Sequence, residues 1–238
     1  MRTRRQHPFD RYVQQPETAI RLTEAALLFA IDRYPQLALG NYLSRLDGIA
    51  RRVESLPPRS PLDQVRALQQ VLVEEQGLRG NAECYYDPRN SYLNDVLDRG
   101  KGIPISLSIV WIDVCQQLEW PFLGIGLPGH FIVGYADAGQ QLWVDPFAGG
   151  RVLGRADCES LVTMACGRAA SLEDTAFTPS PPKAILRRML NNLRVIYYRQ
   201  QAWHFSVDVI RRLAALDPHA IDLEPQLQVA MRRLASYN

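Results

Sequence analysis

The chain has 238 residues, of which 47% are hydrophobic and 22% are charged, and its formal net charge is +2. Such an apolar share supports a sizeable buried core, so an intrinsically disordered chain is excluded. The nearly balanced charge also excludes a strong whole-molecule attraction to nucleic acids or to membrane surfaces.

The four cysteines and the N-terminal residues bear on cellular location. The cysteines show neither a C-x-x-C pair nor the spacing of a metal site, which is typical of free thiols in a reducing compartment. The N-terminal segment MRTRRQHPFD is basic but lacks the apolar run that follows in a secretory signal. No segment approaches the roughly 18 consecutive apolar residues of a membrane span. We therefore expect a cytoplasmic protein with no metal, cofactor, nucleic-acid partner or membrane partner.

Residues 1–78 are expected to form an N-terminal helical layer. Residues 17–33 are helical in composition, and residues 39–53 place apolar side chains on one face of a second helix. A third helix is expected to begin at Ser60 and Pro61, because serine is a favoured N-cap and proline is favoured at the first helical position. Nothing in this layer indicates a catalytic role.

The loop GNAECYYDPRNS, residues 80–91, follows this layer. Glycine, asparagine, aspartate and proline supply its turns, and these residues favour irregular backbone for known steric reasons. We expect Ser91 to cap a short helix over residues 92–98.

The side chains of this loop allow two interpretations. Tyr86, Asp87 and Asn90 are polar or amphipathic groups that could line a binding cleft, where Asn90 could orient a substrate or a water. Alternatively, Asp87 and Asn90 fold the loop on itself, while Tyr85 or Tyr86 fills the core.

Residues 100–150 are expected to organise the fold. Gly102-Ile103-Pro104 predicts the start of an apolar helix, with proline at the first helical position. Short β-rich runs separated by turn residues then predict an antiparallel meander on which the helix packs. The expected strands cover residues 122–127, 131–135 and 142–145, with a turn at Gly139.

Two polar residues in these strands suggest chemistry. His130 opens one strand and Asp145 ends the next, a spacing that can bring the two side chains together in an antiparallel pair. A histidine held by an aspartate is the base-and-orienter part of a nucleophilic triad. The third member is expected at the N-terminus of the preceding helix, where the helix dipole favours a thiolate.

Several segments of the chain resemble a known family. GNAECYYDPRNSYLNDVLDRGKGIPISLS, GIGLPGHFIVGYAD and YPQLALGNYLSRLDGIA are similar to the Sir-B-type branch of bacterial proteins, which have a transglutaminase-like (papain-type) domain and a tetratricopeptide-like tail. The resemblance implies an α+β fold in which residues 79–170 form the transglutaminase-like core. It also implies a tetratricopeptide-like helical tail over residues 183–238.

The resemblance also exposes a departure from the active enzymes. These carry G-x-C at the start of the central helix, whereas this chain has Gly102-Ile103-Pro104, so Pro104 stands where the nucleophile is expected. Ser106 is the nearest hydroxyl and a candidate nucleophile, although a serine in a first helical turn usually bonds local backbone. Cys84 is a less favoured candidate.

Two functional hypotheses remain. The first is a non-catalytic transglutaminase-like module that acts through binding or regulation, with a protein or peptide as its expected partner, and retains His130 and Asp145 as architecture. The second is a hydrolase or acyl transferase in which Ser106, or less favourably Cys84, attacks, His130 is the base and Asp145 orients it. Loss of the family's cysteine favours the first hypothesis. The sequence sets no oligomeric state.

Overall fold

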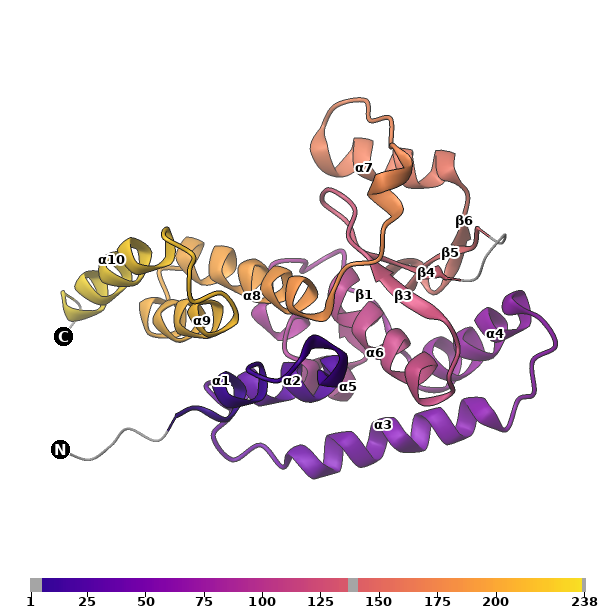
Figure 1. Ribbon diagram of the computed structural model, residues 1–238, viewed down its shortest axis with the longest axis horizontal. Helices are drawn as coiled ribbons and strands as arrows, with labels where there is room; N and C mark the ends of the chain where they lie inside the picture. Colours follow the sequence, from indigo (N-terminus) through magenta and orange to yellow (C-terminus); the bar gives the residue numbers. More distant parts are fainter. Residues whose placement is uncertain (1–5, 137–140, 237–238) are drawn as a thin grey trace.

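Helix α6 (Pro104–Gln117) lies at the centre of the computed structural model, which describes residues 6–136 and 141–236 (Figure 1). It begins at Pro104, as predicted, and its first twelve residues are buried. Apart from Ser106, Ser108 and Asp113, these buried residues are apolar, since the helix packs against a sheet on one side and against helices on the others. The fold is α+β, as the sequence predicts.

The described residues include a four-stranded antiparallel sheet in the order β3-β4-β5-β6. Its strands are β3 (Phe122–Ile125), β4 (Ile132–Tyr135), β5 (Trp143–Asp145) and β6 (Arg151–Leu153). Val133 pairs with Val144, and both belong to the core cluster that contains α6. Ile132 and Trp143 belong instead to a second apolar cluster, beneath α7 (Arg155–Cys166). Three of the four strands match the expected ones, and β6 was not expected.

The N-terminal layer packs on the other side of α6 (Figure 1). Its elements are α1 (Pro8–Tyr12), η1 (Glu17–Ala19), α2 (Leu22–Ala30), α3 (Leu39–Glu54), α4 (Pro61–Leu68) and the π-helical η2 (Gln69–Glu75). The Ser60 hydroxyl accepts a hydrogen bond from the Asp63 N–H, which confirms the predicted start of α4. The helix expected over residues 17–33 is split, because Arg21 is extended and separates η1 from α2.

An ion pair joins this layer to the central helix. Asp113 of α6 is 2% exposed, and Arg21 donates to both its carboxylate oxygens, with N–O distances of 2.7 and 2.9 Å. The hydroxyl of Thr23 and the amide of Gln117 donate to the same carboxylate. The buried charge is therefore fully paired.

Helix α5 (Leu93–Arg99) corrects one expectation. Its N-cap is Tyr92, and Ser91 does not cap it: the Ser91 hydroxyl is buried and has no hydrogen-bond partner among the described residues. Tyr92, which was expected to be the first helical residue, has extended backbone and is itself the N-cap. The helix therefore begins at Leu93, one residue later than expected. The helix ends at Gly100, whose φ of 66° suits a residue without a Cβ.

The C-terminal helices extend away from the sheet (Figure 1). They are α8 (Pro182–Arg199), α9 (Trp203–Leu216) and α10 (Leu223–Ala235), each packed on the next, and η5 (Asp174–Phe177) precedes them. The buried face of α8 shares the core of α6, and the hydroxyls of Tyr92 and Tyr197 lie 2.9 Å apart in that core.

No helix within residues 6–136 and 141–236 combines the length and the apolar character needed to cross a membrane. The basic residues 1–5 and the turn expected at Gly139 lie outside the described residues.

Candidate functional site

His130 and Asp145 form a hydrogen-bonded pair at one end of the sheet. Asp145 is the last residue of β5, and His130 lies two residues before β4 begins, so the register of β4 and β5 brings the two together. Nε2 of His130 lies 3.0 Å from Oδ2 of Asp145. The histidine is 9% exposed and the aspartate 1%, so the pair is largely shielded from water.

The carboxylate is held at both oxygens. Oδ1 of Asp145 accepts a hydrogen bond of 2.9 Å from the N–H of Phe147, in the 3-10 turn η4 (Pro146–Ala148) that follows the strand. A carboxylate at Nε2 favours the neutral tautomer with its proton on that nitrogen, which leaves Nδ1 as the acceptor. This is the arrangement of an oriented base.

Arg188 of α8 fixes the turn that carries His130. Its guanidinium donates to the carbonyl oxygens of Leu127 and His130, at 2.7 and 2.6 Å, and lies over the ring of Phe131. Burial lowers the pKa of Arg188. A Cβ at position 126 would meet the guanidinium at 3.0 Å, so Gly126 gives the arginine room. The C-terminal region thus positions the histidine strand.

The Ser106 hydroxyl is hydrogen-bonded to backbone groups. It is fully buried, its hydroxyl donates to the carbonyl of Asn90 at 2.6 Å, and it accepts from the N–H of Ile103 at 3.0 Å. Its hydrogen bonds with described residues do not include His130. Pro104 is buried at the first position of the same helix and offers no nucleophilic group. Ser106 therefore joins the 80–91 loop to the start of α6.

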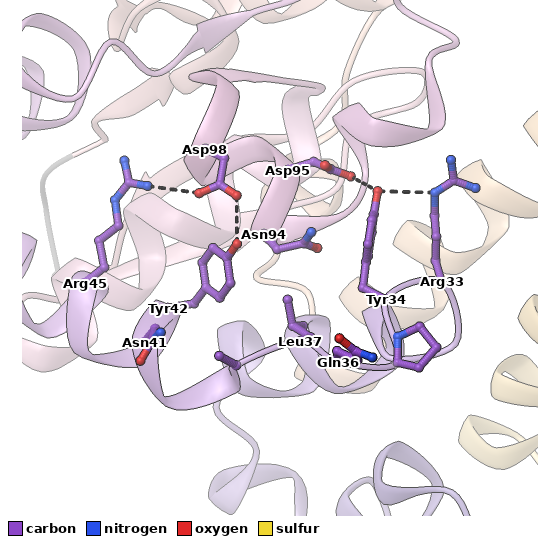
Figure 2. Close-up of a pocket in the computed structure, with 12 residues that line it drawn as sticks. Arg33, Tyr34, Gln36, Leu37, Asn41, Tyr42, Arg45, Asn94, Asp95 and Asp98 are labelled. Atoms are coloured by element: carbon purple, nitrogen blue, oxygen red, sulfur yellow. Dashed lines mark hydrogen bonds and ion pairs between the residues drawn. The ribbon is translucent and has the colours of Figure 1, made fainter.

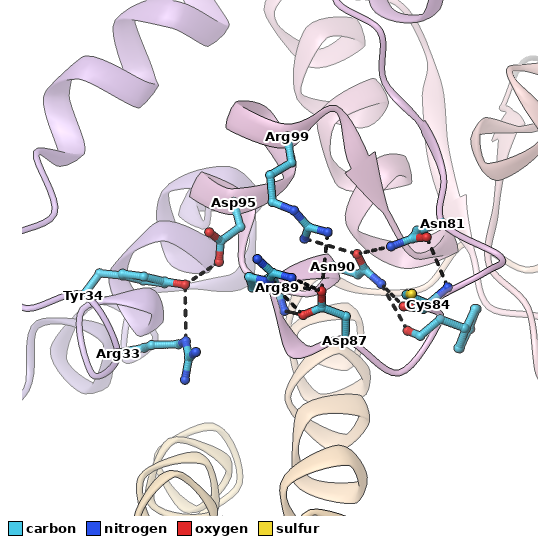
Figure 3. A network of polar contacts seen from close by, with 10 residues as sticks. Arg33, Tyr34, Asn81, Cys84, Asp87, Arg89, Asn90, Asp95 and Arg99 are labelled. Carbon is cyan, nitrogen blue, oxygen red and sulfur yellow. Dashed lines mark hydrogen bonds and ion pairs between the residues drawn. The ribbon is translucent and has the colours of Figure 1, made fainter.

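Asp87 and Asn90 hold the 80–91 loop together (Figure 3). Asn90 is fully buried, accepts from the amide of Asn81 at 3.0 Å and donates to the carbonyl of Cys84 at 2.7 Å. Asp87 accepts from the N–H of Arg89 and pairs with its guanidinium. These contacts match the interpretation in which both side chains fold the loop on itself.

Aromatic rings connect this loop to the histidine. The ring centroid of Phe147 lies 6.2 Å from that of His130 and 6.1 Å from that of Tyr85. Tyr86 contacts Tyr85 at 5.3 Å and is 58% exposed, and the guanidinium of Arg199 lies over its ring. We call Tyr86, Tyr85, Phe147 and His130 the aromatic row. It leads from the surface to the buried pair.

The thiols differ in accessibility. Cys84 and Cys166 are exposed, whereas Cys115 and Cys158 are buried. Burial raises the pKa of Cys115, and it raises the pKa of Cys158 to about 11. Within the described residues, the Cys84 sulfur makes no hydrogen bond with His130.

Sequence reasoning did not select Phe147, Arg188 or Arg199, and it weighed Tyr85 only as a core residue. Phe147 carried a signal, because it follows Asp145-Pro146 directly. The two arginines carried none, because they are 58 or more residues from His130 in the chain and reach the site only through the packing of α8.

Residues 40–191 match the Transglutaminase-like superfamily. The chain is 34% identical over 204 residues to the UPF0162 protein of Xylella fastidiosa strain Temecula1, covering 83% of this chain and 72% of that protein. It is 30% identical over 194 residues to the UPF0162 protein of Pseudomonas aeruginosa, covering 81% and 70%.

A mouse protein is a more distant relative: F-box only protein 21 is 27% identical over 168 residues, which cover 66% of this chain but 26% of that protein. No solved structure matches this chain. The superfamily match extends from α3 into α8 and includes the histidine–aspartate pair, the 80–91 loop and Arg188. The chain belongs to the transglutaminase-like superfamily and, within it, to the UPF0162 family.

Proposed function

We propose that this protein is a non-catalytic transglutaminase-like module that binds a protein or peptide segment on the aromatic row. The observation that carries the proposal is the use of the Ser106 hydroxyl, which is committed to Asn90 and Ile103 while His130 and Asp145 remain paired. Within the described residues, neither the Ser106 hydroxyl nor the Cys84 sulfur is hydrogen-bonded to His130, so the oriented base is not paired with a nucleophile of the triad type. The pair then serves to position Phe147 and the histidine ring.

Tyr86, at the exposed end of the aromatic row, supports the proposal that this surface binds a partner. Tyr86 is 58% exposed and lies under Arg199, and tyrosine and arginine are among the side chains enriched at binding hot spots. The loop that carries Tyr86 is held by Asn90 and Asp87, so the ring is presented on an ordered backbone. We also propose that α8–α10 serve as a tetratricopeptide-like tail of the Sir-B type, beside this surface.

The compartment and the division of the chain are part of the same proposal. The four cysteines are free thiols, which supports a reducing compartment such as the cytoplasm. Residues 1–78, 79–170 and 183–238 would act as supporting layer, site-bearing core and tail. A core shared by α6 and α8 would hold them in one folded unit.

The catalytic alternative is tested with reactive probes. The purified protein is treated with a fluorophosphonate for serine and an iodoacetamide probe for cysteine, and the labelled residues are identified by mass spectrometry. We expect no labelling at Ser106, and labelling at Cys84 at the same rate in the wild type and in His130→Ala. Labelling at Ser106 or Cys84 that His130→Ala abolishes would establish a nucleophile and contradict the proposal.

Binding is tested with peptides selected by phage display against the wild-type protein. Because Tyr86 anchors the proposed surface, Tyr86→Ala should weaken the selected peptides by about tenfold or more. Tyr198→Ala is the matched control: Tyr198 is 60% exposed and lies near α10, beside Pro225 and Val229. Peptides that bind equally well to Tyr86→Ala, or a selection that yields no binder, would contradict the proposal.

A further inference from the structure

A second site lies between α5 and the segment that joins α2 to α3. A pocket of about 830 Å³ is lined by residues of the segment 33–45 and by Asn94, Asp95 and Asp98 of α5 (Figure 2). Much of the first segment is the YPQLALGNYLSR stretch, to which the proposed function assigns no role. Pockets of this size hold small ligands or peptide side chains with their backbone.

Two aspartate carboxylates supply acceptors in this pocket, which is also lined by two arginines, Arg33 and Arg45. The Tyr34 hydroxyl donates to Oδ2 of Asp95, and the Tyr42 hydroxyl donates to Oδ2 of Asp98 at 2.7 Å. Burial, followed by the hydrogen bond to Asp98, raises the pKa of Tyr42 to about 12, so its proton stays in place at neutral pH. The second oxygen of Asp98 receives only a 3.4 Å contact from Arg45. Both carboxylates therefore keep accepting capacity.

The side-chain oxygen of Asn94 accepts no hydrogen bond from the described residues, so a ligand could supply the donor. The residue is 4% exposed, and its Oδ1 is buried without a hydrogen-bond partner among the described residues. Figure 2 shows the amide between the rings of Tyr42 and Tyr34, and Asn94 is one of the residues that line the pocket. A buried acceptor without a partner is costly, and native proteins rarely keep one that has no use.

The charges in the pocket favour a cation at its middle. Arg45 and Arg33 lie at opposite ends in Figure 2, with Asp98, Asn94 and Asp95 between them. Arg33 is engaged by Phe205, over whose ring its guanidinium lies at 4.7 Å. Burial raises the pKa of Asp95, against the hydrogen bond from Tyr34 and the positive charges of nearby arginines, which lower it. Within residues 6–136 and 141–236, no group of three or more His, Cys, Asp and Glu side chains is arranged to hold a metal ion.

We propose that this pocket binds the guanidinium of an arginine side chain in a peptide. The planar fork of a guanidinium carries five N–H donors and can engage two acceptors at once, which suits Asn94 Oδ1 beside two carboxylates. The rings of Tyr34 and Tyr42 flank the position and attract a cation. An ammonium concentrates its donors on a single nitrogen and would span these acceptors less well.

The proposal is tested with acetyl-Gly-Arg-Gly-amide as the probe. Its binding to the full chain is measured by isothermal titration calorimetry, beside the same peptide with citrulline or lysine at the central position and beside free arginine amide. We expect citrulline, which keeps the shape and loses the charge, to weaken binding by at least about tenfold. No binding of the arginine peptide at millimolar concentration overturns the proposal, as does equal binding of the citrulline or lysine peptide. Free arginine amide that binds as tightly as the peptide overturns the assignment to a peptide source.

Two variants locate the site. Asp98→Asn removes one half-exposed carboxylate and should weaken the arginine peptide severalfold, whereas Asp217→Asn should leave the affinity unchanged. Asp217 is the matched control, because it is a similarly exposed aspartate paired with Arg187 on a distant helix. Unchanged affinity in Asp98→Asn overturns the proposal.

Asn94→Leu separates a ligand-binding amide from a structural one. Because the buried oxygen has no hydrogen-bond partner within residues 6–136 and 141–236, the variant should keep or raise the melting temperature while it weakens the peptide by at least about tenfold. A lowered melting temperature shows that the amide supports the fold, and this result overturns the proposal.

Discussion

Asp145 uses its two carboxylate oxygens for different partners, Nε2 of His130 and the N–H of Phe147. We predict that this arrangement fixes the histidine tautomer. In the wild type the neutral imidazole should carry its proton on Nε2, and in Asp145→Asn the proton should move to Nδ1, because an asparagine amide can present a donor to Nε2.

The measurement is the ¹⁵N chemical shift of the two ring nitrogens at a pH where the ring is neutral. Asp145→Asn should also lower the free energy of unfolding by about 1–3 kcal/mol, because a buried charge-assisted hydrogen bond is lost. His204→Gln is the control: this histidine is mostly exposed and contacts Asp208 at 3.7 Å, so neither the shifts of His130 nor the stability should change. An unchanged tautomer in Asp145→Asn would contradict the role given to the carboxylate.

The cysteines provide a second prediction for single residues. A pH of 8 is about three units below the Cys158 pKa of about 11, so only about one molecule in a thousand carries the thiolate at that pH. Cys84 and Cys166 are exposed and should react with iodoacetamide in the native protein, whereas Cys115 and Cys158 should react only after unfolding. Peptide mapping identifies which cysteines are alkylated. Rapid labelling of Cys158 in the native protein would show that its side chain is not buried.

At the scale of an element, α8 holds the turn before β4 through Arg188. In Arg188→Met the carbonyls of Leu127 and His130 lose their charged donor, so we expect a loss of about 2–3 kcal/mol in the free energy of unfolding. Hydrogen exchange should rise in residues 126–131. Arg187→Met is the control on the same helix, because Arg187 is 53% exposed and its surface pair with Asp217 is worth less than about 1 kcal/mol. Equal effects of the two variants would contradict a specific role of Arg188.

The elements that sequence reasoning found are those with local signals. Proline at the first helical position fixed the starts of α4 and α6, and β-rich runs between turn residues located β3, β4 and β5. The pairing of His130 with Asp145 followed from the same strands. Two short elements were not predicted: α1 has five residues, although it also begins at a proline, Pro8, and β6 has three residues, of which two are exposed.

The remaining features depend on tertiary contacts. Ser91 has the residue type of a helix cap, but the chain places Tyr92 at that position and buries the serine. Ser106 was weighed as a nucleophile, and only its distance to the carbonyl of Asn90 identifies its partner. Arg188 contacts a backbone 58 residues away, so no local pattern could reveal it.

At the scale of the whole molecule, one apolar cluster includes residues from α1 to α10, and a paired charge crosses it between Arg21 and Asp113. Arg21→Met would leave the Asp113 carboxylate, 2% exposed, with Thr23 and Gln117 as its hydrogen-bond donors among the described residues. The cost of an unpaired buried charge is typically about 3–5 kcal/mol, and we expect about 3 kcal/mol because Arg21 itself is 31% exposed.

Because the cluster is continuous, this loss should reach parts of the molecule far from the mutation. Hydrogen exchange measured in denaturant should show α2, α6 and α9 losing protection together, at a lower denaturant concentration than in the wild type. Arg52→Met is the control, since Arg52 is 43% exposed and its pair with Glu75 lies on the surface, where about 1 kcal/mol or less is at stake. If Arg21→Met lowered the protection of α2 and left that of α9 unchanged, the N-terminal layer and the tail would be separate folding units. The shared core would then not make them unfold together.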